Sequence, residues 1–272
     1  MNKVFAEIFE KQPVEIVNND YFYKTESEGD QFDEAVANFW LNENGFRDNW
    51  EGKRQGRNEV FKWCDEIAEE IANSGKPFME IACGPGMGLA PAILTKNPKL
   101  PCLATDACSL LIKSWRKYLD ENLPEYNISL ASFSALDMPL KNNSLDYVTS
   151  FIGISSTRSG DNGYVKTISE AYRVLKPGGC LVAVEAEWAD GAAEKIDEVF
   201  KRLGKFNYYA PQNNQLVQTW SEKFIAAGFK IESNTLIQSK TLTKNDCELG
   251  EAAHQFGIEI IQNRRLFVLR KV

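Results

Sequence analysis

EIACGPGMGLA, residues 80–90, is the stretch that decides the fold of this 272-residue chain. An apolar run that reads as a short buried strand leads into it, and a segment that reads as a helix follows it. Its glycines fall at positions 84, 86 and 88. Glycine allows a tight turn with positive φ and leaves room for a ligand against the backbone. Strand, glycine turn and helix in this order predict a ligand-binding loop; a purely structural turn is the alternative.

The spacing of these glycines bears on which ligand the loop would hold. A dinucleotide-binding loop has the pattern G-x-G-x-x-G. Here the third glycine comes one residue early, at Gly88, and Leu89 stands where that glycine is expected. The shortened spacing weakens the interpretation as an NAD-binding loop.

Strands and helices alternate along most of the chain after residue 59. Besides the strand at 78–82, six segments read as strands: 102–107, 127–133, 145–153, 180–186, 229–236 and 264–272. Segments that read as helices, such as 109–123 and 163–175, separate several of them. Repeated βα units predict a doubly wound, Rossmann-like α/β fold with a mostly parallel, seven-stranded sheet. The last strand is expected to be antiparallel.

The chain divides into an N-terminal cap, residues 1–57, and one α/β domain, residues 58–272. The cap is expected to be helical or irregular, since segments such as YFYKTESEGD read as turns and short helices rather than strands. Residues 240–258 show little periodicity and are expected to form a lid or an inserted helix. We expect residues 1–57 and 188–258 to determine substrate specificity, because the central sheet supplies only a cofactor site.

Composition narrows the classes of function. The net charge is -7 and no stretch forms a basic stripe, so a nucleic-acid partner is not expected. The six cysteines are scattered without a C-x-x-C pair and there is one histidine, which predicts reduced thiols and no metal site. The N-terminus lacks the pattern of a signal peptide and no run of eighteen uncharged apolar residues occurs. We therefore predict a soluble, cytoplasmic protein without membrane contact.

Two carboxylates stand out in the predicted strands. Glu80 interrupts the apolar run before the glycine loop, where burial requires an ion pair or a cationic part of a ligand. Asp106 ends the next strand, 18 residues after Gly88. A carboxylate there can accept hydrogen bonds from both hydroxyls of a ribose, as in dinucleotide-binding folds, or cap the following helix.

The chain resembles the class I S-adenosylmethionine-dependent methyltransferases, in particular the small-molecule group related to the ubiquinone-biosynthesis enzymes. The resemblance spans about residues 60–187 and rests on FMEIACGPGMG, LATDA, SALDMPLKNNSLDYVTS and EAYRVLKPGGCLVAVE, in that order. It implies that S-adenosylmethionine is the cofactor and S-adenosylhomocysteine the product. LKPGG in the last segment also has a plain structural explanation, because it ends a helix and turns the chain into the next strand.

The resemblance also implies a set of cofactor-binding positions. They are Glu80, Ala82, Gly84, Gly86, Gly88, Asp106, Ala107, Ser134, Ala135 and Phe151. Ser134 stands where the family usually has an aspartate that contacts the adenine amino group, and Asp137 is a candidate substitute three residues on. Asp146 matches an acidic residue that is mostly structural in the family.

The expected reaction is transfer of a methyl group to an oxygen, nitrogen or carbon nucleophile of a small metabolite. Family members often have a histidine after the fourth strand, whereas this chain reads FIGISSTR, and His254 is its only histidine. Four tyrosines are candidates to line the pocket: Tyr21, Tyr23, Tyr208 and Tyr209. The sequence assigns no catalytic residue, acceptor or oligomeric state. The alternatives are a cofactor-binding protein without transferase activity, and a methyltransferase that acts on protein or RNA.

Overall fold

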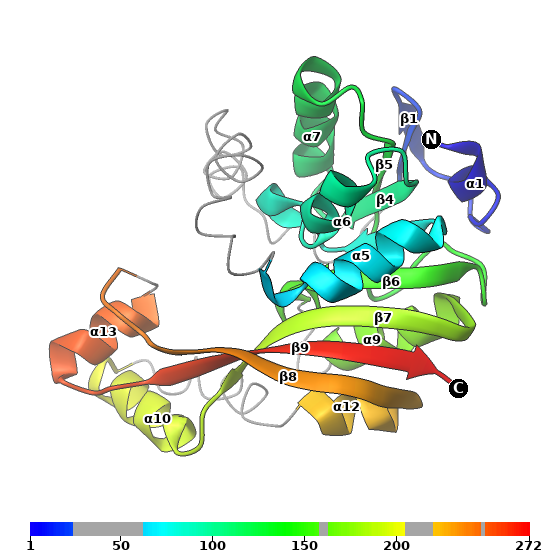
Figure 1. The fold of residues 1–272 in the computed structure, drawn as a ribbon. Helices are drawn as coiled ribbons and strands as arrows, with labels where there is room; N and C mark the ends of the chain where they lie inside the picture. Colours follow the sequence, from blue (N-terminus) through cyan, green and yellow to red (C-terminus); the bar gives the residue numbers. More distant parts are fainter. Residues whose placement is uncertain (24–61, 158–162, 205–219, 246–247) are drawn as a thin grey trace.

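A nine-stranded mixed sheet forms the centre of the computed structural model, which describes residues 1–23, 62–157, 163–204, 220–245 and 248–272 (Figure 1). The strand order is β1-β2-β5-β4-β3-β6-β7-β9-β8. The parallel centre consists of β3 (Phe78–Ile81), β4 (Cys102–Asp106), β5 (Ile128–Ser132), β6 (Leu145–Phe151) and β7 (Leu175–Trp188). From β3 the chain adds β4 and β5 on one side and β6 and β7 on the other, and ligands bind at such a switch point.

Helices cover both faces of this sheet (Figure 1). On one face, α5 (Asp65–Ser74), α6 (Ala90–Lys96) and α7 (Ser109–Asn122) pack through side chains such as Ile71, Ile93 and Trp115. On the other face, α9 (Gly163–Val174) and α12 (Trp220–Ala226) pack through side chains such as Ile168 and Phe224. The core strands are buried on both faces, which explains their nearly continuous apolar sequences.

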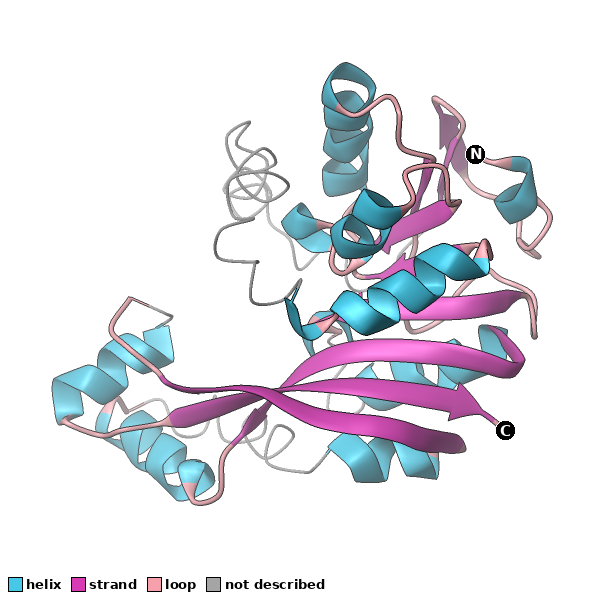
Figure 2. Ribbon diagram, in the orientation of Figure 1, coloured by secondary structure: helices cyan, strands magenta, loops and turns pink. Residues whose placement is uncertain are grey.

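The three long strands at the C-terminal side of the sheet extend beyond its centre (Figure 2). They are β7, β8 (Phe229–Thr241) and the antiparallel β9 (Ile261–Lys271). Two helices, α10 (Ala192–Arg202) and α13 (Glu248–Phe256), pack against each other there around a separate apolar cluster. Helix α10 of this α10–α13 lobe follows the carboxyl end of β7. The lobe therefore lies at the same edge of the sheet as the glycine loop, which follows the carboxyl end of β3. Helix α13 lies within residues 240–258, where a lid or an inserted helix is expected, and the last strand is antiparallel as predicted.

The strand count and part of the cap differ from the prediction. Besides α1 (Lys3–Ala6), the N-terminal segment forms two short strands, β1 (Glu15–Val17) and β2 (Asp20–Phe22), and β2 pairs in parallel with β5. The expectation that residues 21–22 are not in a strand was wrong. Three-residue strands are too short to show periodicity, and pairing with the sheet edge decides their conformation. The rest of the cap, 24–57, lies outside the described residues.

A buried ion pair fastens this N-terminal hairpin to the domain. Asp20 is 1% exposed, and its carboxylate accepts hydrogen bonds from Arg116 of α7 and from the N–H of Leu130 in β5.

Among the described residues, no helix is long and apolar enough to cross a membrane.

Candidate functional site

The glycine loop between β3 and α6 is tightly bent. Left-handed backbone conformations occur at four of its positions: Ala82, Gly84, Met87 and Gly88. Two hydrogen bonds hold the loop to neighbouring elements: the N–H of Cys83 donates to Thr105 O at 2.8 Å, and the Trp115 indole donates to Gly84 O at 2.8 Å. The loop, including its short η3 turn (Gly84–Gly86), is therefore fixed by β4 and α7 before any ligand binds.

Glu80 lies beneath this loop and explains one of its glycines. The side chain is completely buried, and Thr149 Oγ1 of β6 donates a hydrogen bond to Glu80 Oε2. A Cβ atom on Gly88 would lie 1.7 Å from Glu80 Oε1. The early third glycine is thus required because the glutamate occupies the space that any side chain at position 88 would need.

Asp106 lies at the carboxyl end of β4, directly beside the loop. Its Oδ2 accepts a hydrogen bond from Gly84 N at 3.0 Å and its Oδ1 from Cys108 N at 2.9 Å. Burial raises the pKa of Asp106, and the backbone N–H donors of Cys108, Gly84 and Ala107 oppose that rise. An ionised carboxylate accepts about four hydrogen bonds. Each carboxylate oxygen accepts one of the two hydrogen bonds above, which leaves acceptor capacity for a ribose hydroxyl, so the chemistry of this residue fits an adenosine-containing cofactor.

The segment after β5 runs alongside Asp106. The N–H of Phe133 donates to Asp106 O at 3.2 Å, and Ser134 Oγ accepts a hydrogen bond from Leu136 N at 3.2 Å. Asp137, the candidate substitute for the missing adenine aspartate, is exposed and forms an ion pair with Lys11 at 2.7 Å. Its carboxylate is therefore engaged by the N-terminal segment.

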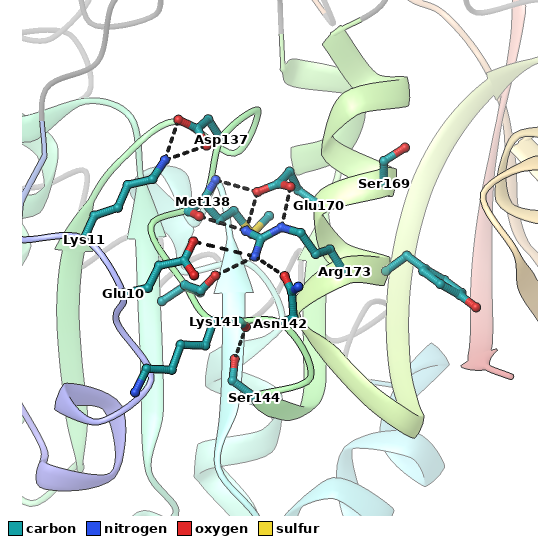
Figure 3. A network of polar contacts seen from close by, with 12 residues as sticks. Glu10, Lys11, Asp137, Met138, Lys141, Asn142, Ser144, Ser169, Glu170 and Arg173 are labelled. Atoms are coloured by element: carbon teal, nitrogen blue, oxygen red, sulfur yellow. Dashed lines mark hydrogen bonds and ion pairs between the residues drawn. The ribbon is translucent and has the colours of Figure 1, made fainter.

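A network around Arg173 of α9 fixes the same segment (Figure 3). Arg173 donates to Met138 O at 2.9 Å and to Leu140 O at 2.6 Å. Glu170, one turn earlier, accepts from Arg173 Nε at 2.7 Å and from Met138 N at 2.7 Å. The pair of side chains thus holds three backbone groups of residues 138–140. The sequence does not predict this clamp, formed by Glu170 and Arg173, because its partners are backbone atoms and every residue has the same backbone groups.

The other side of the loop faces the end of β6. Half-buried Phe151 ends that strand, and the chain then turns at Ile152, whose backbone is left-handed with φ 56°. Behind this turn lies Glu185 of β7, completely buried, whose carboxylate accepts hydrogen bonds from Ile154 N and Ser155 N. Burial raises the pKa of Glu185 to about 7. Sequence reasoning missed Glu185, although a single carboxylate in the apolar run CLVAVEA is the signal that had singled out Glu80.

The structure brings most of the predicted positions together around the carboxyl ends of β3, β4, β5 and β6. These positions are Glu80, Ala82, Gly84, Gly86, Gly88, Asp106, Ala107, Ser134, Ala135 and Phe151. Asp146 forms ion pairs with Lys76 and Lys176 at the opposite end of β6, in line with a structural role.

The remaining candidates lie elsewhere or have other contacts. His254 is exposed on α13. Tyr21 and Tyr23 pack against Phe9, with ring centroids 5.1 and 5.6 Å away. Tyr208 and Tyr209 lie outside the described residues. The described part of the chain contains no cluster of metal-binding side chains.

Several known proteins with similar sequences are named as methyltransferases. Residues 78–179 match the family described as "Methyltransferase domain". The "Ubiquinone/menaquinone biosynthesis C-methyltransferase UbiE" of Rickettsia prowazekii is 31% identical over 208 residues, which cover 75% of this chain and 77% of that protein. The "Demethylmenaquinone methyltransferase" of Listeria welshimeri is 26% identical over 125 residues, 46% of this chain and 51% of that protein.

A solved structure agrees with this likeness. A methyltransferase candidate from Bacillus halodurans C-125 superposes with a TM-score of 0.52 at 18% identity, covering 75% of this chain and 98% of that one. At this identity the likeness concerns the fold alone. Together with the sequence relatives, it defines the class: this chain belongs to the class I S-adenosylmethionine-dependent methyltransferases. It is a small-molecule methyltransferase of the group related to ubiquinone biosynthesis, and S-adenosylmethionine is its methyl donor.

Proposed function

We propose that this enzyme methylates a ring carbon of a small hydroquinone-type acceptor. The observation that carries the proposal is the 31% identity to a Rickettsia protein named as a ubiquinone/menaquinone biosynthesis C-methyltransferase, over 77% of that protein's length. A hydroquinone ring carbon becomes a nucleophile once a ring hydroxyl has lost its proton. The new carbon–carbon bond forms at that ring carbon, which afterwards releases its own proton to restore the aromatic ring.

We assign the cofactor site to the positions around the glycine loop. Asp106 would accept hydrogen bonds from the ribose hydroxyls, and the loop at 82–88 would lie along the methionine part. Ser134 and Ala135 would border the adenine, and Phe151 would face the reacting end. This assignment is supported by the acceptor capacity of Asp106 and by the hydrogen bond that joins it to Gly84.

The chain's contribution to the reaction is orientation and exclusion of water. When bound, S-adenosylmethionine supplies a methyl group on a positively charged sulfur that becomes an uncharged thioether on transfer. A loop held rigidly by Thr105 and Trp115 keeps the donor in one position, which is how positioning lowers the barrier of a two-reactant step. A water-poor site favours the dispersal of charge in such a displacement. None of the described side chains is assigned as a catalytic acid or base.

The α10–α13 lobe and the N-terminal cap are the proposed sources of acceptor specificity. The lobe follows the carboxyl end of β7, on the side of the sheet that carries the glycine loop. That residues 240–258 act as a lid stays a prediction, which activity assays of lobe variants would test. A cytoplasmic location also stays a prediction, which cell fractionation would test.

Transfer of labelled methyl groups tests the proposal. The enzyme is supplied with methyl-labelled S-adenosylmethionine and chemically reduced demethylmenaquinone with a short side chain, and separately with phenol-, amine-, protein- and RNA-containing pools. We expect label in the quinol ring. Label found only in another pool would show that the acceptor belongs to that pool's class and not to the hydroquinones. Tight cofactor binding without transfer to any pool would instead favour a binding protein without transferase activity. Asp120→Asn, an exposed change on α7, is the control for variants of Asp106.

A further inference from the structure

A buried carboxylate from β7, that of Glu185, holds the turn that follows β6. Glu185 belongs to β7, and its side chain is completely buried. Its Oε1 accepts a hydrogen bond from Ile154 N at 3.1 Å and its Oε2 from Ser155 N at 3.3 Å. The carboxylate therefore links the strand to two successive N–H groups of the short helix α8 (Gly153–Ser156).

The turn needs such support because its backbone is strained. Ile152 has φ 56° and ψ 17°, a conformation that a β-branched residue rarely adopts. A Cβ on the next residue, Gly153, would lie 2.7 Å from both Ile81 O and Ser150 Oγ. Strain of this kind persists only where the surroundings over-determine the backbone, and it is concentrated at functional sites. Here β7 supplies the restraint, through Val184 O, which accepts from Ile152 N at 2.7 Å, and through Glu185.

The same turn touches the proposed cofactor loop. The Cβ position at Gly153 lies 3.1 Å from the Ala82 side chain, and Ser150 pairs with Ile81, the last residue of β3. On the open side, the exposed Ser156 hydroxyl donates to Ile152 O at 2.6 Å. The turn thus lies between the methionine end of the cofactor site and solvent, where an acceptor has to approach.

A carboxylate in this position does not serve the stability of the fold. Among the described residues no cationic group forms an ion pair with Glu185, and burial raises its pKa to about 7. A buried charge without a counter-charge is costly, and a neutral side chain of the same shape is usually tolerated or stabilising. A strongly perturbed carboxylate beside a reaction site is a candidate for a functional role.

We propose that Glu185 is a positioning residue for methyl transfer, which fixes the Ile152–Ser155 turn as the acceptor-side wall of the site. The inference rests on the proposed function. Glu185 itself does not touch the reacting atoms; it acts through the two N–H groups that it holds. Its carboxylate suits this task because both oxygens accept, whereas an amide would turn one NH2 group towards an N–H donor.

Glu185→Gln is the test variant, and Glu187→Gln is its matched control. Glu187 lies two residues further on the same face of β7 and pairs with Arg265 instead of the turn. For Glu185→Gln we expect at least a tenfold loss of kcat with reduced demethylmenaquinone, an S-adenosylmethionine Kd within threefold of the wild type, and an equal or higher Tm. For Glu187→Gln we expect kcat within threefold. An unchanged kcat in Glu185→Gln, or a Kd that rises in step with the loss of kcat, would overturn the proposal.

Amide hydrogen exchange separates this inference from the proposed function, because it needs no acceptor. In Glu185→Gln at least one of the N–H groups of residues 154 and 155 should exchange at least tenfold faster than in the wild type, while those of β7 stay protected. Unchanged exchange would show that Glu185 does not hold the turn. If the wild type transferred no methyl group to any acceptor, the proposed function would fail and the positioning role with it, whatever the exchange rates.

Discussion

Replacing Gly88 by alanine is expected to damage the glycine loop far more than the same change at Gly84. Both glycines have left-handed backbone, with φ 54° at Gly88 and 55° at Gly84. Each alanine therefore carries a similar backbone cost of about 1–2 kcal/mol. The surroundings differ, because an added Cβ at Gly84 meets nothing within 4 Å, whereas at Gly88 it lies 1.7 Å from Glu80 Oε1.

The difference in stability expected between the two variants follows from the hydrogen bond that Glu80 loses when its carboxylate is displaced. Ordinary van der Waals contact begins at 3.4 Å, so the carboxylate has to retreat well over an ångström. Such a shift breaks its hydrogen bond from Thr149 Oγ1. Leaving a buried polar group without its hydrogen-bond partner costs about 1–3 kcal/mol. We expect Gly88→Ala to lower the free energy of unfolding by about 2–5 kcal/mol and Gly84→Ala by about 1–2 kcal/mol.

Urea unfolding followed by tryptophan fluorescence measures both variants, since Trp115 is completely buried and bonds to the loop. A double variant, Gly88→Ala with Glu80→Ala, removes the collision and should lose less stability than the sum of the two single changes. Equal losses at Gly84 and Gly88, or additive losses in the double variant, would refute the collision argument.

The other predictions concern buried charges. Burial raises the pKa of Glu185 from 4.5 to about 7, so ionising it costs stability: the folded protein is most stable below about pH 4.5, and stability falls as the pH rises through about 7. Between pH 5 and pH 8, urea titrations should show the free energy of unfolding of the wild type falling by about 2.5 kcal/mol more than that of Glu185→Gln. Parallel changes would contradict the raised pKa. Arg173→Met removes the clamp on residues 138–140 and should weaken S-adenosylmethionine binding roughly tenfold in calorimetry; unchanged affinity would show that the segment keeps its shape unaided. Asp20→Ala leaves Arg116 without its buried partner and should lower the free energy of unfolding by about 3–5 kcal/mol; a loss below about 1 kcal/mol would mean that the hairpin is held by other contacts.

The central sheet could be predicted because its signals are local. Each of the five parallel strands is a short apolar run bounded by turn residues, and the glycine loop marks where the first strand ends. The hairpin of β1 and β2 could not be predicted, because strands of three residues show no period. Tyr21 joins the central strands by pairing with Ala131, a residue 110 positions away.

The candidate site was partly predictable for a similar reason. The spacing of Asp106 from the glycine loop placed its carboxylate beside the loop, and the structure puts it 3.0 Å from Gly84 N. The reason for the third glycine could not be predicted, because it depends on where the Glu80 carboxylate lies in the folded protein. Glu185 lies 105 residues after Glu80 and accepts hydrogen bonds from backbone N–H groups, so only its isolation in an apolar run could have marked it.

The central claim is that Asp106 holds the ribose of S-adenosylmethionine. Isothermal calorimetry with S-adenosylhomocysteine tests it most directly on the wild type, on Asp106→Ala and on the exposed control Asp120→Asn. Two hydrogen bonds to a carboxylate contribute about 3–6 kcal/mol, so Asp106→Ala should bind roughly 150- to 25,000-fold more weakly, while Asp120→Asn binds as the wild type does. Wild-type affinity in Asp106→Ala would contradict the assignment, and the absence of binding to the wild-type enzyme would contradict the cofactor site as a whole.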